Sequence, residues 1–388
     1  MNKKHSTKTL ISLMLLAASA TFLLTFFVLH QIYGADDELR AEMRRIEEVR
    51  TLIAARYVGE YEESALTEAA LIATVQALGD RWSHYMTPEQ HEAHLRRIGN
   101  RQQGIGINFI RHEETGELLI VAVTPGSPAE AAGLLAGEHL VTLQGQPAAD
   151  LETVEIQQLV TEQYGHYVTV EMRDEAGKLR TVRVYVKEFY VNPVSYELLE
   201  ENIGYIRIAN FDRQSDVETI NAIESLREAG AEGLIFDARV NPGGRLDALL
   251  ALLDYLLPEG EIFVYEDQHG VEHVRHSGPD YLRMPMVVLV DANSFSAAEL
   301  FAAVLQEYDW AEIVGIPTTG KSRVQLTIPL STGSGLHLSI SRYLTPGRVD
   351  LYEAGGVQPD HVVENELGGE DRQLEKALEV LRQLILNP

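Results

Sequence analysis

The sequence predicts an α/β protein that carries a smaller β-rich domain and has helical regions at both ends. Two observations lead to this prediction. Short runs of β-branched residues, separated by Gly and Pro, begin at Gly104, and beyond Val186 apolar strand patterns alternate with helical ones. The 388 residues, 45% of them apolar, suffice for two or three domains with cores of their own.

The charge and cysteine content narrow the functional classes. Lys and Arg number 32 against 58 Asp and Glu, a formal net charge of -26, so the surface repels phosphate backbones and nucleic acid is not expected as a partner. The chain has no cysteine, which excludes disulfides, thiol nucleophiles and cysteine-ligated metals. An exported protein without cysteines needs no oxidising compartment, so the absence of cysteine does not indicate in which compartment the protein lies.

Residues 1–35 are predicted to anchor the chain in a membrane. Three lysines precede an uncharged apolar run over residues 10–29, which is long enough to cross a hydrocarbon core of about 30 Å. Ala18-Ser19-Ala20 has the residue types of a signal-peptide cleavage site, but the apolar run continues beyond it. We therefore expect an uncleaved anchor rather than a cleaved signal, with the rest of the chain outside the cytoplasm, in the periplasm or at the cell surface. Arginines beyond the run match the lysines in number, which leaves the orientation less determined.

Residues 36–100 are predicted to be helical, since Glu, Arg and Ala are dense and Ile46, Val49, Leu52 and Ile53 fall at helical spacing. This region is interpreted as a spacer with no chemical role. At the other end, residues 367–388 form an amphipathic pattern, which predicts a helix that docks as a C-terminal cap.

Residues 101–188 resemble a PDZ domain. The resemblance rests on the order of strand, short helix, Gly-terminated turn and strand around Gly126-Ser127-Pro128-Ala129. PDZ domains add an extended peptide to a sheet edge and hold its terminal carboxylate on backbone N–H groups of a Gly-rich loop. That loop is expected at Gly104, Ile105, Gly106 and Ile107. The alternative is a β-rich spacer whose glycines only form turns.

Residues 189–366 alternate strands and helices and are predicted to form a sheet covered by helices. The expected strands are 203–208, 234–237 and 286–290, and the expected helices begin at Ser215, Leu246 and Ala297.

Three segments of this region carry residues suited to catalysis. Ser296 lies where a buried strand meets a helix, so it is either a helix cap or a nucleophile beside the free N–H groups that start at Ala297. The pair Gly243-Gly244 allows a close backbone approach to negative charge, and a nucleotide-binding loop is disfavoured because the Gly-Lys-Ser/Thr ending is absent. Lys321 is either a solvated surface charge or a base, and the second role requires burial to lower a pKa ordinarily near about 10.4.

The order and spacing of these segments resemble the carboxyl-terminal processing (tail-specific) serine proteases. The resemblance implies a crotonase-like (ClpP-like) protease core with an inserted PDZ domain. It implies that Ser296 is the nucleophile, three residues before Glu299, and that Lys321, 25 residues further on, is the general base. By the same resemblance Gln325 orients the lysine, and Gly243 or Gly244 shares the oxyanion with Ala297. The sequence departs from the family pattern at Phe295, Ala298, Trp310 and Ser322, so no preference for a cut-site side chain is carried over.

The predicted function is endoproteolysis near the C-terminus of polypeptides whose apolar tails the PDZ domain captures, with no metal or organic cofactor required. A homo-oligomer or a regulatory partner is left open. The alternative is a membrane-tethered, non-catalytic PDZ scaffold with an inactive core, against which the joint retention of Ser, Lys, Gln and the Gly pair argues. A hydratase on the same kind of core needs a coenzyme A site, to which nothing in the sequence points.

Two smaller alternatives concern single residues. His269, His273 and His276 have a spacing compatible with metal binding, but Gly270, Gly278 and Pro279 around them favour an exposed hairpin. Ser294 is the alternative nucleophile, and the spacing to Glu299 and Lys321 favours Ser296.

Overall fold

The computed structural model describes residues 37–112, 116–174, 176–366 and 369–387. The chain divides into two compact units, residues 1–67 and 68–388. The predicted membrane anchor at residues 1–35 lies outside the described residues. Within the described ranges no helix combines the length and the apolarity needed to cross a membrane.

The first unit contains helix α2 (Asp37–Arg56) and the start of α3 (Glu63–Gln76), which continues into the second unit. Arg50 of α2 forms an ion pair with Glu63 at the start of α3. Met43, Ile46, Val49 and Leu52 recur at helical spacing along α2, and all four side chains are exposed.

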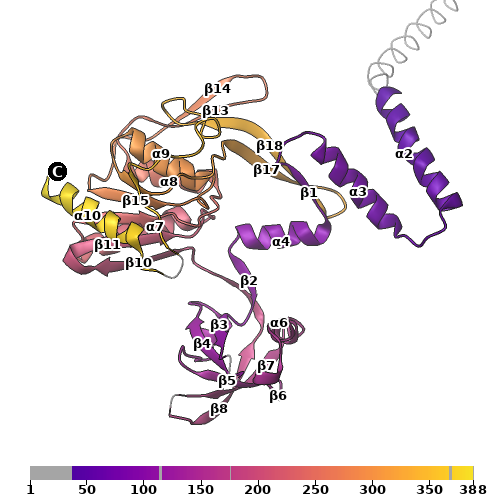
Figure 1. Cartoon of the computed structure of the whole chain (residues 1–388), viewed down its shortest axis with the longest axis horizontal. Helices are drawn as coiled ribbons and strands as arrows, with labels where there is room; N and C mark the ends of the chain where they lie inside the picture. Colours follow the sequence, from indigo (N-terminus) through magenta and orange to yellow (C-terminus); the bar gives the residue numbers. More distant parts are fainter. Residues whose placement is uncertain (1–36, 113–115, 175, 367–368, 388) are drawn as a thin grey trace, which may run out of the picture. The chain divides into compact units, whose positions relative to one another are not determined.

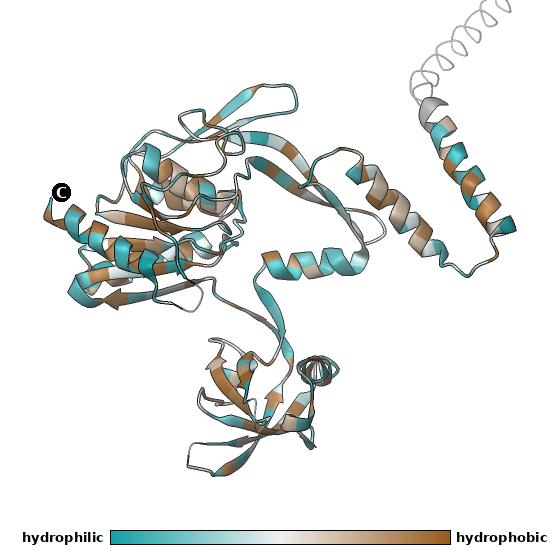
Figure 2. Cartoon of the chain, in the orientation of Figure 1, coloured by the Kyte–Doolittle hydropathy of each residue, from teal (hydrophilic) through white to brown (hydrophobic). Residues whose placement is uncertain are grey.

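The larger sheet of residues 189–366 has the order β10-β11-β12-β15-β16-β19. Strands β10, β11 and β15 of this sheet are labelled in Figure 1. Only the edge strand β10 (Val194–Leu199) is antiparallel to its neighbour; the others are parallel. The parallel strands are β11 (Ile203–Ile208), β12 (Gly233–Asp237), β15 (Met286–Val290), β16 (Glu312–Gly315) and β19 (His361–Val362). Every residue of β12 and β15 is buried, which explains their continuous apolar sequences (Figure 2).

Helices cover both faces of this sheet. On one face lies the main core, where Phe236 of β12 and Val288 of β15 cluster with residues of α7 (Ser215–Glu228), α8 (Leu246–Leu256) and α9 (Ala297–Glu307). On the other face Ile235 and Val287 pack against α10 (Arg372–Leu386), so the predicted C-terminal helix docks on the sheet. Alternate residues of the same strand thus serve the two layers.

A second sheet of the core has the order β1-β18-β13-β14, with β17 paired to β18. Its strands are β13 (Glu261–Glu266), β14 (Glu272–His276), β17 (Arg323–Pro329), β18 (Gly335–Leu344) and β1 (His84–Met86). Strand β1 lies antiparallel to β18, with His84 opposite His337 and Met86 opposite Gly335. The sequence predicted helix throughout residues 36–100, and that prediction is wrong at β1, because three residues are too few to reveal a strand period against helical flanks.

Helix α4 (Pro88–Ile98) follows β1 and starts with a capping box formed by Thr87 and Gln90. The ribbon of β2 (Arg101–Gly104) and β9 (Lys187–Tyr190) then leads to and from the inserted β-rich domain. That domain has the strand order β3-β4-β5-β7-β8, with β6 beside β5. The elements within it are β3 (Ile107–Arg111), β4 (Leu118–Val123), α5 (Pro128–Ala131), β5 (His139–Leu143), β6 (Gln146–Pro147), α6 (Thr153–Thr161), β7 (Tyr167–Arg173) and β8 (Leu179–Tyr185).

Candidate active site

Ser296 occupies the N-cap position of α9, after the turn that leaves β15. Its backbone has φ 55° and ψ -113°. Positive φ is uncommon for a residue with a Cβ and persists only where the surroundings impose it. Ser296 therefore has the strained strand–turn–helix setting that presents a nucleophilic hydroxyl in many hydrolases.

Glu299 connects the segments that carry Ser296 and Lys321. Its side chain is fully buried, and its Oε2 accepts the backbone N–H of Ser296 at 2.7 Å and that of Lys321 at 2.9 Å. Its Oε1 accepts the N–H of Gly320 and the hydroxyl of Thr318, each at 2.6 Å. One carboxylate thus satisfies four donors, and the backbones of Ser296 and Lys321 are held side by side.

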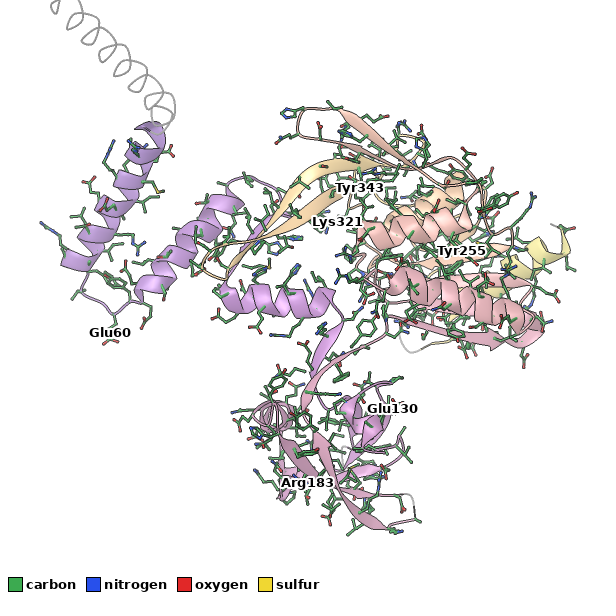
Figure 3. The ribbon with its side chains drawn as sticks, turned by 180° about the vertical axis from the view of Figure 1, so that it is seen from behind. Glu60, Glu130, Arg183, Tyr255, Lys321 and Tyr343 are labelled. Atoms are coloured by element: carbon green, nitrogen blue, oxygen red, sulfur yellow. The ribbon has the colours of Figure 1, made fainter. Side chains whose placement is uncertain are left out.

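The Lys321 side chain is half-buried, and its surroundings lower the pKa of its amine. Burial is the main cause, and the negative charges of Glu299 and Asp80 oppose it by raising the pKa. The Nζ atom is 4.8 Å from the centre of the Trp82 ring. The lysine precedes β17, and the buried Tyr343 on the adjacent strand β18 donates its hydroxyl to the Lys321 carbonyl (Figure 3).

Gln325 lies on β17, four residues beyond Lys321. Its Nε2 donates to the carbonyl oxygen of Trp82 at 2.6 Å. Within the described part of the chain, no hydrogen bond joins the Lys321 amine to Ser296 or to Gln325. Hydrogen bonds between catalytic groups are often long in ligand-free proteins and shorten when substrate binds.

The Gly-rich turn lies against Ser296. A Cβ at Gly243, whose φ is 83°, would be 2.6 Å from Phe295 O, 2.8 Å from Ala297 N and 3.0 Å from the Ser296 Cβ. Only glycine fits there. The Gly243 N–H already donates to Asn241 Oδ1 at 2.8 Å, whereas the N–H groups of Gly244 and Ala297 have no acceptor among the described residues. Of the two glycines, Gly244 is therefore the one with a donor left for an oxyanion.

Ser294 has a structural role. It is fully buried, its hydroxyl donates to Ala238 O at 2.8 Å and it accepts the Asp291 N–H at 3.0 Å. A hydroxyl engaged in this way is not available to attack a substrate, so Ser296 remains the candidate nucleophile.

The three histidines with metal-like spacing lie at or beside β14. His269 is in the turn of the β13–β14 hairpin, and His273 Nε2 lies 3.1 Å from Asp267 Oδ2. His276 is opposite Glu261 at the other end of the hairpin. In the described ranges no group of three side chains is arranged to hold a metal ion.

The predicted peptide-binding loop connects β2 to β3. Gly106 has φ 82°, and a Cβ there would lie 2.3 Å from the Ser127 Cβ, so glycine is required. Ile105 is buried in the core of the domain. The carbonyls of Ile105 and Gly106 accept N–H groups of Ala129 and Thr124, while their own N–H groups have no acceptor in the described structure.

Four residues near the site were not singled out from the sequence: Trp82, Asn241, Thr318 and Tyr343. Tyr343 lies on β18, the strand that pairs with β17 directly after Lys321. Asn241 precedes the Gly pair. No local pattern in the sequence indicated Trp82, because its hydrogen-bond partner Gln325 lies 243 residues further along the chain.

Comparison with known proteins gives two family matches. Residues 202–363 match peptidase family S41 and residues 103–186 match the PDZ domain family. A carboxyl-terminal-processing protease of Picosynechococcus sp. is 30% identical over 318 residues, which cover 79% of this chain and 77% of the relative. A carboxyl-terminal-processing protease of Synechocystis sp. is 29% identical over 310 residues, which cover 78% of this chain and 72% of the relative.

A solved structure shares the fold. It is a protein of Bacteroides fragilis assigned to the S41 proteases, and it superposes with a TM-score of 0.57 at 17% identity over 85% of this chain and 92% of its own. At that identity the likeness concerns the fold alone.

Proposed function

Because the chain belongs to peptidase family S41, the carboxyl-terminal processing serine proteases, we propose that Ser296 and Lys321 form the catalytic pair of its peptide cleavage. The membership confirms the resemblance on which the sequence analysis relied. It also confirms a serine peptidase with a crotonase-like core and an inserted PDZ domain that acts on polypeptides.

The shared carboxylate of Glu299 is the observation on which this assignment rests. It brings a strained serine at a helix N-terminus next to a lysine whose pKa burial has lowered. A lowered pKa increases the share of the neutral amine, which is the form that a general base needs. No histidine forms a hydrogen bond to Ser296 within the described residues, so a histidine base has no support here.

The proposed reaction has two stages. Neutral Lys321 accepts the Ser296 hydroxyl proton while Oγ bonds to the scissile carbonyl carbon, and the N–H groups of Gly244 and Ala297 stabilise the oxyanion. Collapse breaks the C–N bond, and the departing amine takes the proton from Lys321. Water then attacks the acyl-enzyme with Lys321 again as base, releasing the new C-terminal carboxylate and restoring the serine. Gln325 orients the lysine in both stages.

The PDZ domain is proposed to select substrates with apolar C-termini. The uncommitted N–H groups of Ile105 and Gly106 suit a terminal carboxylate. Binding of a fluorescent peptide with an apolar free C-terminus tests this role. The peptide is expected to lose affinity when its carboxylate is amidated, and equal affinity of the two forms contradicts carboxylate capture.

Cleavage of an unfolded polypeptide with an apolar C-terminus tests the catalytic pair in the full chain. Ser296→Ala and Lys321→Ala are expected to abolish cleavage, whereas Lys376→Ala removes a surface lysine paired with Glu379 and is expected to leave it unchanged. Trapping of the acyl-enzyme by a serine-directed reagent, located by mass spectrometry, identifies the nucleophile independently. Cleavage by Ser296→Ala at the wild-type rate refutes the assignment.

We also propose that residues 1–35 anchor the protein in a membrane with the catalytic body outside the cytoplasm. The support is the basic start followed by the apolar run over residues 10–29. Membrane fractionation and the mass of the mature N-terminus test both parts, and recovery of a chain shortened at its N-terminus in the soluble fraction contradicts the anchor.

A further inference from the structure

Trp82 contacts both Lys321, the proposed base, and Gln325, which is proposed to orient it, although Trp82 lies outside the span that matches the peptidase family. The centre of its ring is 4.8 Å from Lys321 Nζ, and its carbonyl oxygen accepts the Gln325 Nε2 at 2.6 Å. One residue of the segment before the PDZ domain thus contacts the lysine with its side chain and the glutamine with its backbone.

The loop that carries Trp82 is fixed to the core. Asp80 accepts the Trp82 N–H at 3.1 Å and the Ser83 hydroxyl at 2.5 Å. The Ser83 oxygen in turn accepts the N–H of Ser339 on β18 at 2.9 Å. Immediately after the loop, β1 pairs with β18 (Figure 1). Trp82 is therefore held in place beside the lysine by hydrogen bonds on both sides of it.

The Trp82 carbonyl sets the orientation of the Gln325 amide. A carbonyl only accepts hydrogen bonds, so the amide branch that faces it must be the NH2 group. The Gln325 oxygen then occupies the other branch. That oxygen is the only part of the amide that can accept a hydrogen bond from an amine. By accepting a hydrogen bond from the lysine amine, this oxygen leaves the lone pair of the amine free for the serine proton, and the Trp82 carbonyl therefore selects the useful orientation.

The Trp82 ring acts on Lys321 in two opposite ways. By displacing water it destabilises the ammonium form and lowers the lysine pKa. By presenting its π face it attracts the ammonium and raises the pKa. Burial is the largest influence on the Lys321 pKa, and the Trp82 ring is one of the groups that bury the amine, so we expect the first effect to dominate.

We propose that Trp82 is a positioning residue for the general base: its ring closes the Lys321 pocket to water and its carbonyl orients the Gln325 amide. This inference rests on the proposed function, in which Lys321 is the base. It assigns to the segment before the PDZ domain a part in catalysis beyond that of a spacer.

The other charged and titratable groups around the lysine come from three elements. Glu299 lies on α9 and Asp80 precedes β1, and both raise the Lys321 pKa. His337 and Tyr343 lie on β18. Burial lowers the pKa of His337 to about 4, so this histidine is neutral near pH 7, and burial raises the pKa of Tyr343 well above its ordinary value.

The experiment measures the Lys321 pKa directly, by competitive labelling of the full chain with an amine-acylating reagent over a pH series and mass spectrometry of the Lys321 peptide. The variants are Trp82→Ala, which opens the pocket, and Trp82→Leu, which keeps it apolar but has no π face. Trp310→Ala is the matched control, since Trp310 is the only other tryptophan and packs elsewhere in the core. Cleavage assays give kcat, KM and the acidic limb of the pH profile for the same proteins.

In Trp82→Ala the Lys321 pKa is expected to rise by about one unit or more, with a loss of about tenfold or more in kcat near neutral pH and little change in KM. In Trp82→Leu the pKa is expected to equal the wild-type value or to fall below it. Trp310→Ala is expected to lower stability without moving the pKa. The proposal is overturned if Trp82→Ala loses cleavage while its Lys321 pKa stays at the wild-type value. It is also overturned if the Lys321 pKa rises as much in Trp82→Leu as in Trp82→Ala. Failure of the proposed function is distinguishable from failure of the Trp82 proposal. If Lys321 is not the base, wild type and Lys321→Ala cleave alike, whatever the labelling shows.

Discussion

Glu299→Gln tests how the site is assembled, because this one carboxylate accepts hydrogen bonds from the segments on both sides of the catalytic pair. The four donors are the N–H groups of Ser296, Gly320 and Lys321 and the hydroxyl of Thr318. Glutamine has the same shape but one acceptor oxygen, and its NH2 group must face donors on one side.

The magnitude follows from the four bonds. With its oxygen toward Ser296 and Lys321, glutamine keeps two bonds without charge assistance, a loss of about 1 kcal/mol each. The Gly320 N–H then faces an NH2 group and loses its partner at a cost of about 1–3 kcal/mol, while the Thr318 hydroxyl can turn and accept. We expect Glu299→Gln to lower the free energy of unfolding by about 3–5 kcal/mol.

The same substitution has a predictable effect on the pH profile. The Glu299 charge raises the Lys321 pKa, so removing it lets that pKa fall further. In the proposed mechanism Lys321 acts as a base only when neutral, so the acidic limb of kcat/KM is expected to move to lower pH. This is the opposite of the direction expected for Trp82→Ala.

Urea denaturation followed by circular dichroism measures the stability, and cleavage rates over a pH series locate the limb. Glu307→Gln is the control, since Glu307 is an exposed glutamate on the same helix that accepts from Thr345 and Gly347. Its effect on stability is expected to stay within about 1 kcal/mol. An unchanged unfolding midpoint in Glu299→Gln, or a limb that moves to higher pH, refutes this account of the site.

Three further outcomes concern backbone and charge. Gly243→Ala is expected to reduce kcat by about a hundredfold or more, because its Cβ would displace Ala297 N. Gly133→Ala is the control: Gly133 also has a positive φ, 73° against 83° at Gly243, but nothing lies within 4 Å of an added Cβ, so this variant is expected to cleave like wild type. Arg239→Met is expected to cost about 3–5 kcal/mol in urea unfolding, because it leaves the buried Asp237 without its cation; a loss under about 1 kcal/mol contradicts this. Burial alone would raise the pKa of Asp371, but hydrogen bonds, chiefly from Arg239, lower it to about 2. The ionised Asp371 carboxylate therefore stabilises the fold above the unfolded-state pKa of about 3.9, and this contribution is lost as the pH falls through about 2. Asp371→Asn is expected to remove this pH dependence from the free energy of unfolding.

Much of the fold followed from local patterns. The buried strands at β12 and β15 have continuous apolar sequences, and the helices after them begin where the sequence indicated. Strand β1 was missed because its three residues adjoin strong helical patterns, and its partner β18 lies some 250 positions later. Pairing between such distant segments depends on the whole core and has no local signal.

For the candidate site, too, the sequence predicted one part and the tertiary structure decided the other. The chain order of Ser296, Glu299, Lys321 and Gln325, together with the glycine pair, was enough to name the residues. Which of Gly243 and Gly244 keeps a free N–H was left open, and the side chain of Asn241 decides it by accepting from Gly243.

The sequence by itself determined the chemical types and their order, because a nucleophile, a base and two glycines at fixed spacing are properties of the chain. Only the tertiary structure decided that Ser296, which does occupy the N-cap of α9, is also a strained residue beside a lysine, and how far the Lys321 side chain is buried. The physical reason is that a lysine pKa depends on the water and charges around the amine. Trp82, Glu299 and Asp80, which supply that environment, reach Lys321 from positions 22 to 241 residues away, and only folding brings them together.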